Sequence, residues 1–171
     1  MLKAIGSICI IIGCAGVGIC LREKIYDTLE QMRIIIQILK NISNEVLYHK
    51  NTLEDAVKIV AVKQKEPFDD LLLHVTGRYQ DNSGISFATA WQEAFEEYKD
   101  ELYLSKETTE QLMTLFSATQ RNPQLQYEKI RETIGRIEDE LHVMEKNSSN
   151  QGRMYVCLGV LTGMISTIIL I

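Results

Sequence analysis

Helix-breaking residues are scarce in this sequence. It contains only two prolines, Pro67 and Pro123, and three of its ten glycines lie between residues 22 and 151. Apolar residues recur there at spacings of three and four, which is the period of an amphipathic α-helix. The middle of the chain is therefore predicted to be an all-α domain, a compact antiparallel bundle of about six helices.

Cysteine is also absent from the middle. The four cysteines, Cys9, Cys14, Cys20 and Cys157, all lie in two apolar end segments. This distribution excludes a disulfide framework or a cysteine-based zinc site within the bundle.

Positive charge is limited. With Lys3 set aside, residues 22–153 hold seventeen lysines and arginines against twenty-three acidic residues, a net charge of −6. Nucleic-acid binding needs clustered positive charge to neutralise phosphates, so we expect no nucleic-acid partner.

The short motifs of catalysis are missing as well, since the sequence has no phosphate loop, zinc-ligand spacing or nucleophile elbow. Glu45 and His49 lie one helical turn apart, which favours a surface contact over an acid–base pair. His74 and His142 have no flanking ligand set. We expect neither an enzyme nor a bound metal or cofactor.

Two long apolar segments are present instead. Residues 2–21 carry only Lys3 as a charge, and residues 154–171 carry none. Their lengths are about the ~17 to 25 residues that a membrane-spanning helix requires. The predicted organisation is a transmembrane helix at 1–21, a helical bundle at 22–152 and a transmembrane helix at 153–171.

The basic residues that flank these segments predict the topology. Arg22, Lys24 and Arg33 follow the first segment, and Lys146 and Arg153 precede the second. Because lysine and arginine are enriched on the cytoplasmic side, the bundle is expected to be cytoplasmic.

Processing of the N-terminus remains open. The sequence Ile11-Ile12-Gly13-Cys14 resembles a bacterial lipobox, and Lys3 followed by an apolar stretch fits a signal peptide loosely. The apolar run continues past Cys14 into a helical pattern, which favours a retained helix.

Within the middle, capping residues predict where the helices begin. The first helix should continue from the membrane segment to about residue 48, a rod of some 70 Å at ~1.5 Å per residue. Thr52, Pro67, Ser86 and Ser105 suit the starts of four short helices. A sixth should run from about 125 to 146, burying Leu125 among others, with a joint at 147–152.

The second apolar segment has a face of small residues. Gly159 and Gly163 form a GxxxG motif, which Thr167 extends, and such faces let helices approach closely. The face could pack on the first apolar segment or on a partner.

Three short motifs suggest a relationship. The family pattern E-x-x-Y-x-x-x-T-P-L-x-x-A is matched by Glu45, Tyr48, Thr52, Leu53 and Ala56, without the proline before the leucine. A second pattern, A-W-x-x-A, matches Ala90, Trp91 and Ala94, and Gln126 and Ile130 match a third, Q-x-x-x-I. By the order of these motifs and the two apolar ends, the chain resembles the stage III sporulation protein AB family of endospore-forming bacteria. The family's L-G-x-x-D element is blurred here, with Ser117 in place of the glycine.

This resemblance implies a fold like the cytoplasmic domain of the type II secretion platform protein F. It implies a membrane-anchored adaptor in a secretion-like channel complex between mother cell and forespore, located in the mother cell membrane. The implied partners are a cytoplasmic secretion-type ATPase, stage III sporulation protein AA-like, and other channel subunits. Glu45, Tyr48, Leu53, Ala56 and Trp91 become candidate residues for partner docking or for shaping the turn.

A different class of function fits the same two apolar ends. The chain could be a two-helix membrane receptor, or a lipoprotein, whose helical bundle lies outside the cytoplasm and binds a ligand. The side of the membrane on which the bundle lies separates the two hypotheses.

Overall fold

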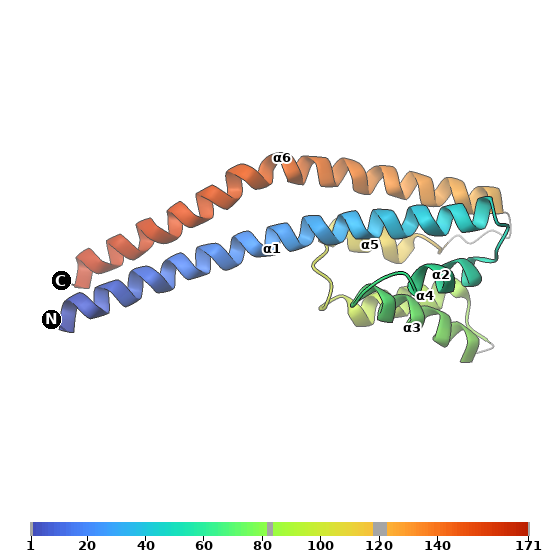
Figure 1. The fold of residues 1–171 in the computed structure, drawn as a ribbon, viewed down its shortest axis with the longest axis horizontal. Coiled ribbons are helices and arrows are strands. Elements are labelled where there is room, and N and C mark those ends of the chain that lie inside the picture. The colour runs from blue at the N-terminus through green and yellow to red at the C-terminus, as the bar shows by residue number, and fades with distance from the viewer. Residues whose placement is uncertain (1, 82–83, 118–122, 171) are drawn as a thin grey trace. The chain divides into compact units, whose positions relative to one another are not determined.

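The structure is a computed structural model that describes residues 2–81, 84–117 and 123–170. The side chains of most residues in the ranges 2–22 and 149–170 lie outside that description. Over the described residues the fold is entirely helical, as the sequence predicts (Figure 1). Six helices follow one another: α1 (Leu2–Leu47), α2 (Leu53–Ala61), α3 (Phe68–Asp81), α4 (Phe87–Tyr98), α5 (Lys106–Thr114) and α6 (Pro123–Leu170).

The chain divides into two compact units, one of which is built from parts that are distant in the sequence. One unit combines the ranges 1–29 and 142–171, and thus the outer parts of α1 and α6. The other, Glu30–Leu141, contains the inner parts of these two helices and all of α2 to α5. This second unit is called the bundle below.

Three of the predicted helix starts are confirmed at their capping side chains. The hydroxyls of Thr52, Ser86 and Ser105 each accept a hydrogen bond from a backbone N–H three residues on, at 3.2, 3.1 and 2.9 Å. Such caps satisfy N–H groups that have no partner within the helix. Thr52 also donates its hydroxyl proton to Asp55 Oδ2 at 2.7 Å. Proline was expected to open α3, and Pro67 lies one position before its first residue.

Aromatic and aliphatic side chains fill the core of the bundle. The apolar face of α2 is buried, and α4 buries Trp91 and Phe95 together with Ala90 and Ala94. Phe116 packs edge-on against the Trp91 ring, with ring centroids 4.8 Å apart. The indole Nε1 of Trp91 donates to the Leu112 carbonyl at 2.8 Å, which ties α4 to α5.

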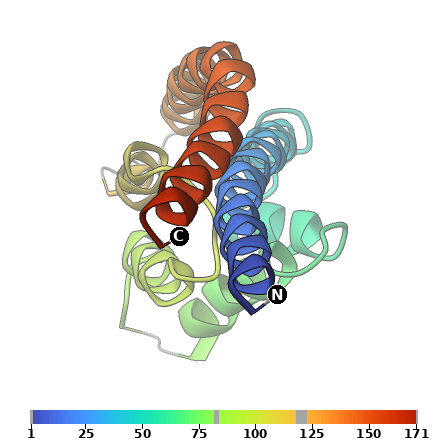
Figure 2. The same cartoon turned by 90° about the vertical axis from the view of Figure 1, so that its left-hand side faces the viewer.

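Polar contacts fix α5, α1 and α6 within the bundle. The inner parts of α1 and α6 lie side by side (Figure 1, Figure 2), joined by an ion pair of 2.6 Å between Lys40 Nζ and Glu138 Oε1. Thr108, which is fully buried, donates its hydroxyl to Glu140 Oε2 at 2.8 Å. The α5 helix is therefore held against α6 by a hydrogen bond to a charged group, a stronger class than neutral pairs.

The two long helices confirm one prediction and overturn another. α1 is continuous over 46 residues, about 69 Å at ~1.5 Å per residue, as expected. α6 also runs without interruption through residues 147–152, where a joint was predicted. Glycine, serine and asparagine cost a helix interior only about 1 kcal/mol each or less, so neighbouring turns can override them. Ser148 fits the helix by donating its hydroxyl to the Glu145 carbonyl at 2.8 Å.

One predicted core position is wrong. Leu125 leaves 42% of its surface exposed, whereas Ile130 and Ile137, further along α6, are fully buried. Leu125 belongs to the first turn of α6, where the helical period alone does not show whether a neighbour covers the side chain.

The predicted membrane helices at 1–21 and 153–171 fall mostly on residues whose side chains lie outside the described part. Across the positions that are described, no helix has a stretch both long and apolar enough to span a membrane.

Candidate functional site

The corner between α1 and α2 is organised by one carboxylate. Glu45 Oε2 lies 3.2 Å from His49 Nδ1 and accepts a hydrogen bond from Asn51 Nδ2 at 2.9 Å. The Glu45 carbonyl also accepts from the Asn51 backbone N–H at 3.3 Å. Between them, Lys50 adopts a left-handed conformation with φ of 53°. The Glu45–His49 contact is thus the surface pair that the spacing predicts, and Glu45 shapes the turn.

The five candidate residues for docking or for shaping the turn lie in different environments, and we call them the signature: Glu45, Tyr48, Leu53, Ala56 and Trp91. Ala56 is fully buried, and Leu53 and Trp91 are 8% and 1% exposed, so all three contribute to the core. Tyr48 is 72% exposed at the end of α1. Gly159, Gly163 and Thr167 are part of α6, but their side chains lie outside the described residues. Of the signature, Tyr48 is the residue with a broad surface available to a partner.

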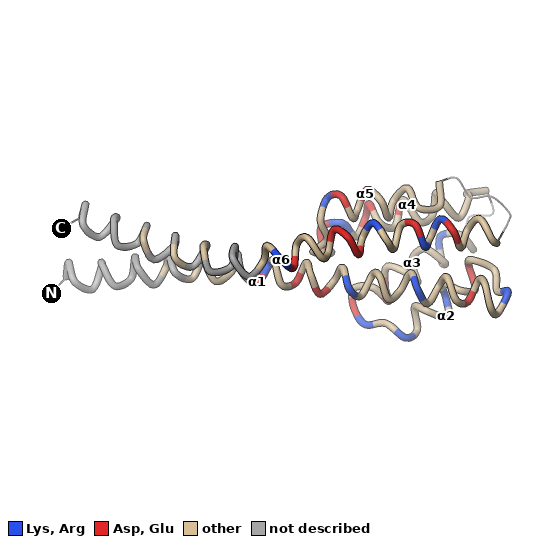
Figure 3. The backbone as a smooth tube through the Cα atoms, turned by 90° about the horizontal axis from the view of Figure 1, so that it is seen from above, with Lys and Arg blue, Asp and Glu red and all other residues tan. Residues whose placement is uncertain are grey.

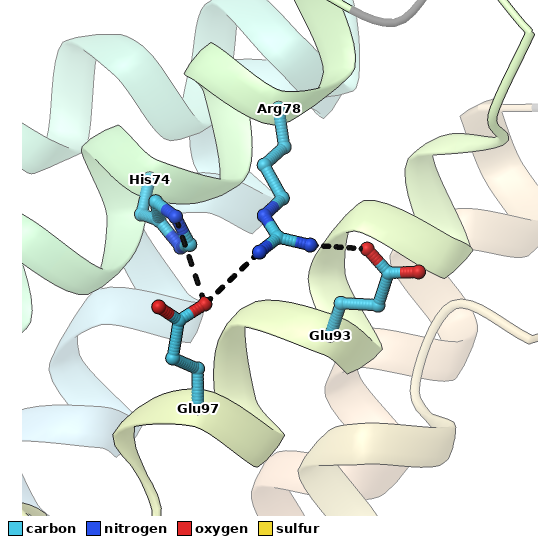
Figure 4. Close-up of polar contacts among 4 residues, drawn as sticks. All are labelled: His74, Arg78, Glu93 and Glu97. Carbon is cyan, nitrogen blue, oxygen red and sulfur yellow. Dashed lines mark hydrogen bonds and ion pairs between the residues drawn. The ribbon is translucent and has the colours of Figure 1, made fainter.

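A charged cluster joins α3 to α4 on the surface of the bundle (Figure 4). Arg78 Nη1 lies 2.6 Å from Glu93 Oε2, and Arg78 Nη2 lies 3.1 Å from Glu97 Oε2. His74 Nε2 approaches the same Glu97 oxygen at 3.7 Å. Because His74 and Arg78 are one turn apart on α3, and Glu93 and Glu97 one turn apart on α4, the four side chains meet across the helix pair.

The order of these contacts shows that α3 and α4 are antiparallel. Arg78, late in α3, contacts Glu93 early in α4, whereas His74 contacts Glu97 and packs its ring 5.7 Å from that of Tyr98. The beginning of α3 and the end of α4 therefore lie at the same end of the bundle.

Negative charge gathers at that end. The pKa of Tyr98 is raised, first by burial and then by the nearby carboxylates of Asp70, Glu101, Glu97 and Asp69. Each carboxylate repels the negative charge that the Tyr98 phenol would carry after losing its proton, so the neutral hydroxyl is favoured.

The cluster borders an open groove of about 560 Å³ on α3 and α4. Its lining includes Glu93, Glu96 and Glu97, with Arg78 as its basic side chain. Lys99 is paired with Glu96, and this contact raises the pKa of the Lys99 ammonium. Arg78 and Lys99 thus pair with all three glutamates of the lining, and one net negative charge remains. Within the described ranges, no group of three histidine, cysteine or acidic side chains is arranged to bind a metal ion.

The sequence alone does not reveal this cluster, because His74 has no ligand set along the chain. The signal available was the i,i+4 spacing of His74 with Arg78 and of Glu93 with Glu97. That spacing is common on solvated helices, and only the pairing of α3 with α4 turns it into one site.

Comparison with known proteins decides the family. A model of the family described as stage III sporulation protein AB matches residues 3–171. The chain belongs to that family. It is thereby a sporulation protein, and the resemblance seen in its motifs is confirmed.

A solved structure of stage III sporulation protein AB has the same fold. It is similar with a TM-score of 0.64 and 20% sequence identity, over 71% of this chain and 96% of that chain. No curated protein matches the sequence.

Proposed function

We propose that this stage III sporulation protein AB family member is a membrane-anchored platform or adaptor. In this proposal, residues 1–21 and 153–171 sit in the mother cell membrane facing the forespore, and the bundle lies in the cytoplasm. There it couples a secretion-type ATPase, stage III sporulation protein AA-like, to the other subunits of a channel complex. The protein acts as a connector and not as an enzyme.

The observation that supports this proposal is the continuity of the two long helices. α1 and α6 each run from an apolar end of the chain into the bundle without a break. A continuous helix transmits displacement along its axis, because each hydrogen-bonded turn fixes the next one. Motion received by the bundle would reach the apolar ends without loss in a flexible linker.

The acidic groove on α3 and α4 supports a docking role. Its three glutamates exceed the two cations paired with them by one charge. This net negative charge attracts a basic patch on the ATPase, and complementary charge raises the rate of association. Tyr48 offers a second contact at the corner of α1 and α2.

Helix continuity can be tested at Asp27, an exposed residue of α1 between the apolar end and the bundle. Proline there removes a helical hydrogen bond and costs about 3 kcal/mol, whereas alanine preserves the helix. We expect Asp27→Pro to reduce spore formation to the level of a strain lacking the gene, at unchanged protein amounts, and Asp27→Ala to sporulate normally. Normal sporulation of the proline variant would refute mechanical coupling through α1.

Topology is tested by labelling a cysteine at position 106. The Lys106 side chain is 92% exposed, so Lys106→Cys in a chain whose native cysteines are replaced by serine presents an accessible thiol. We expect a membrane-impermeant maleimide to label this variant only after cell lysis. Labelling of intact cells would favour the receptor or lipoprotein hypothesis, because a cytoplasmic ATPase could not reach the bundle.

A further inference from the structure

The end of the bundle where α3 begins and α4 ends carries charges of both signs that are not paired with one another. Figure 3 shows basic and acidic positions interspersed over the bundle helices. At this end, three exposed lysines follow one another over the last turn of α2 and the connection to α3: Lys58, Lys63 and Lys65. Among the described residues, none of their side chains forms an ion pair or hydrogen bond.

Apolar surface accompanies these lysines. Val62, the C-cap of α2 with helical backbone angles, is 78% exposed, and Ile59, three residues earlier, is 37% exposed. Residues three and four apart share a helix face, so Ile59 and Val62 lie together between the lysines. We call Lys58, Ile59, Val62, Lys63 and Lys65 the α2 edge.

Carboxylates lie next to the α2 edge. The connection to α3 is short and hydrogen-bonded, since the N–H groups of Phe68 and Asp69 both donate to the Lys65 carbonyl, at 3.0 and 3.3 Å. This places Asp69 and Asp70 within about one turn of Lys65.

Two further carboxylates follow α4 at the same end. The N–H of Glu101 donates to the Tyr98 carbonyl at 3.0 Å, so Asp100 and Glu101 continue directly from the helix. We call Asp69, Asp70, Asp100 and Glu101 the acidic edge. Leu73, 44% exposed and one turn after Asp69, gives this edge an apolar contact of its own.

We infer that these two edges form a self-complementary interface, through which a second copy of this chain binds by two-fold symmetry. In a two-fold interface every contact occurs twice. If one residue of the first copy contacts a different residue of the second copy, the same two residues also meet with the copies exchanged. The α2 edge of each copy thus faces the acidic edge of the other. Val62 and Leu73 meet near the centre, and the charges form a polar rim.

The balance of charge favours a second copy over an anionic membrane. Within one copy, the three lysines are outnumbered by the four carboxylates of the acidic edge, and Glu66, next to Lys65, adds a fifth. A surface with this excess of negative charge is repelled by anionic lipid. A second copy, turned by two-fold symmetry, places its carboxylates against the lysines of the first copy and its lysines against the carboxylates. Both edges are then paired at once.

The test uses the full-length chain in a non-ionic detergent, with association measured by sedimentation velocity. We expect a reversible dimer that weakens as salt rises, because exposed charges are screened. Lys63→Glu with Lys65→Glu should raise the dimer dissociation constant at least about tenfold, since like charges then face each other. The matched control, Lys106→Glu with Lys129→Glu, makes the same change of charge outside both edges and should leave the dimer intact.

A charge swap makes the test specific. Asp100→Lys with Glu101→Lys should also prevent self-association, whereas a mixture of the two charge-reversed proteins should form a heterodimer. This rescue requires that the two edges face each other, and it shows that both variants are folded. A wild-type chain that stays monomeric, a dimer insensitive to both reversals, or a failed rescue would overturn the inference. So would a monomer that instead binds phosphatidylglycerol vesicles through the lysines.

Discussion

Replacing Trp91 by phenylalanine tests whether this signature residue acts through packing. The indole is 1% exposed, packs between Phe95 and Phe116, and donates its Nε1 proton to the Leu112 carbonyl at 2.8 Å. Losing that hydrogen bond costs about 1 kcal/mol. Removing the second ring loses buried apolar surface and leaves a small cavity, for roughly 1 to 2 kcal/mol more. We therefore expect Trp91→Phe to lower the free energy of unfolding by about 2 to 3 kcal/mol.

The measurement is chemical denaturation of the full-length chain followed by far-ultraviolet circular dichroism. Trp91 is the only tryptophan, so fluorescence can follow the wild type but not the variant. Tyr48→Ala is the matched control, because Tyr48 is a signature aromatic that is 72% exposed. An exposed substitution of this kind should change stability by no more than about 0.5 kcal/mol.

The opposite pattern would refute this reasoning. If Trp91→Phe changed the free energy of unfolding by less than about 1 kcal/mol but abolished binding of a partner, Trp91 would be a docking residue that becomes accessible in the complex. If Tyr48→Ala destabilised the fold as much as Trp91→Phe, the exposed fraction of a side chain would not predict which of the two residues contributes to stability.

Three further predictions concern the bundle. Gly77→Ala should raise the free energy of unfolding by about 0.5 to 1 kcal/mol, because a Cβ there meets no atom within 4 Å and alanine favours the helix; a lower midpoint in a denaturant titration would contradict it. A double-mutant cycle of Thr108→Val and Glu140→Gln should give a coupling energy of about 1 kcal/mol from their hydrogen bond, and additive effects would show that the bond contributes nothing. Because the folded pKa of Tyr98 is raised, the folded state retains the phenolic proton longer than the unfolded chain does, so stability falls as the pH rises through the unfolded value of about 10. Tyr98→Phe should reduce that fall in a thermal unfolding series, and an unchanged pH dependence would count against the carboxylate cluster.

Local chemistry explains which parts of the fold could be predicted. The caps at Thr52, Ser86 and Ser105 depend on a hydroxyl and an N–H three residues apart, and this distance is fixed within one turn. The buried stripe of α2 follows in the same way from the helical period. Such features hold whatever the neighbouring helices do.

The errors lie where neighbouring structure decides the outcome. Residues 147–152 have low helix propensity, yet α6 continues through them, because propensity differences of about 1 kcal/mol per residue or less can be overridden by the neighbouring turns of a long helix. Leu125 matches the apolar period of α6 but remains 42% exposed, since a period marks a face and does not supply a partner for every residue on it.

The candidate site shows the same limit for function. A motif of apolar and aromatic residues looks alike whether its members pack in a core or bind a partner. Burial separates them here: Ala56 and Trp91 hold the bundle together, Glu45 fixes the turn into α2, and Tyr48 remains accessible. The His74, Arg78, Glu93 and Glu97 cluster has no such motif, because its two halves are ordinary charged pairs until α3 and α4 meet. A search for docking residues in this family should therefore begin with exposed side chains that meet across helices, before the residues that recur along the sequence.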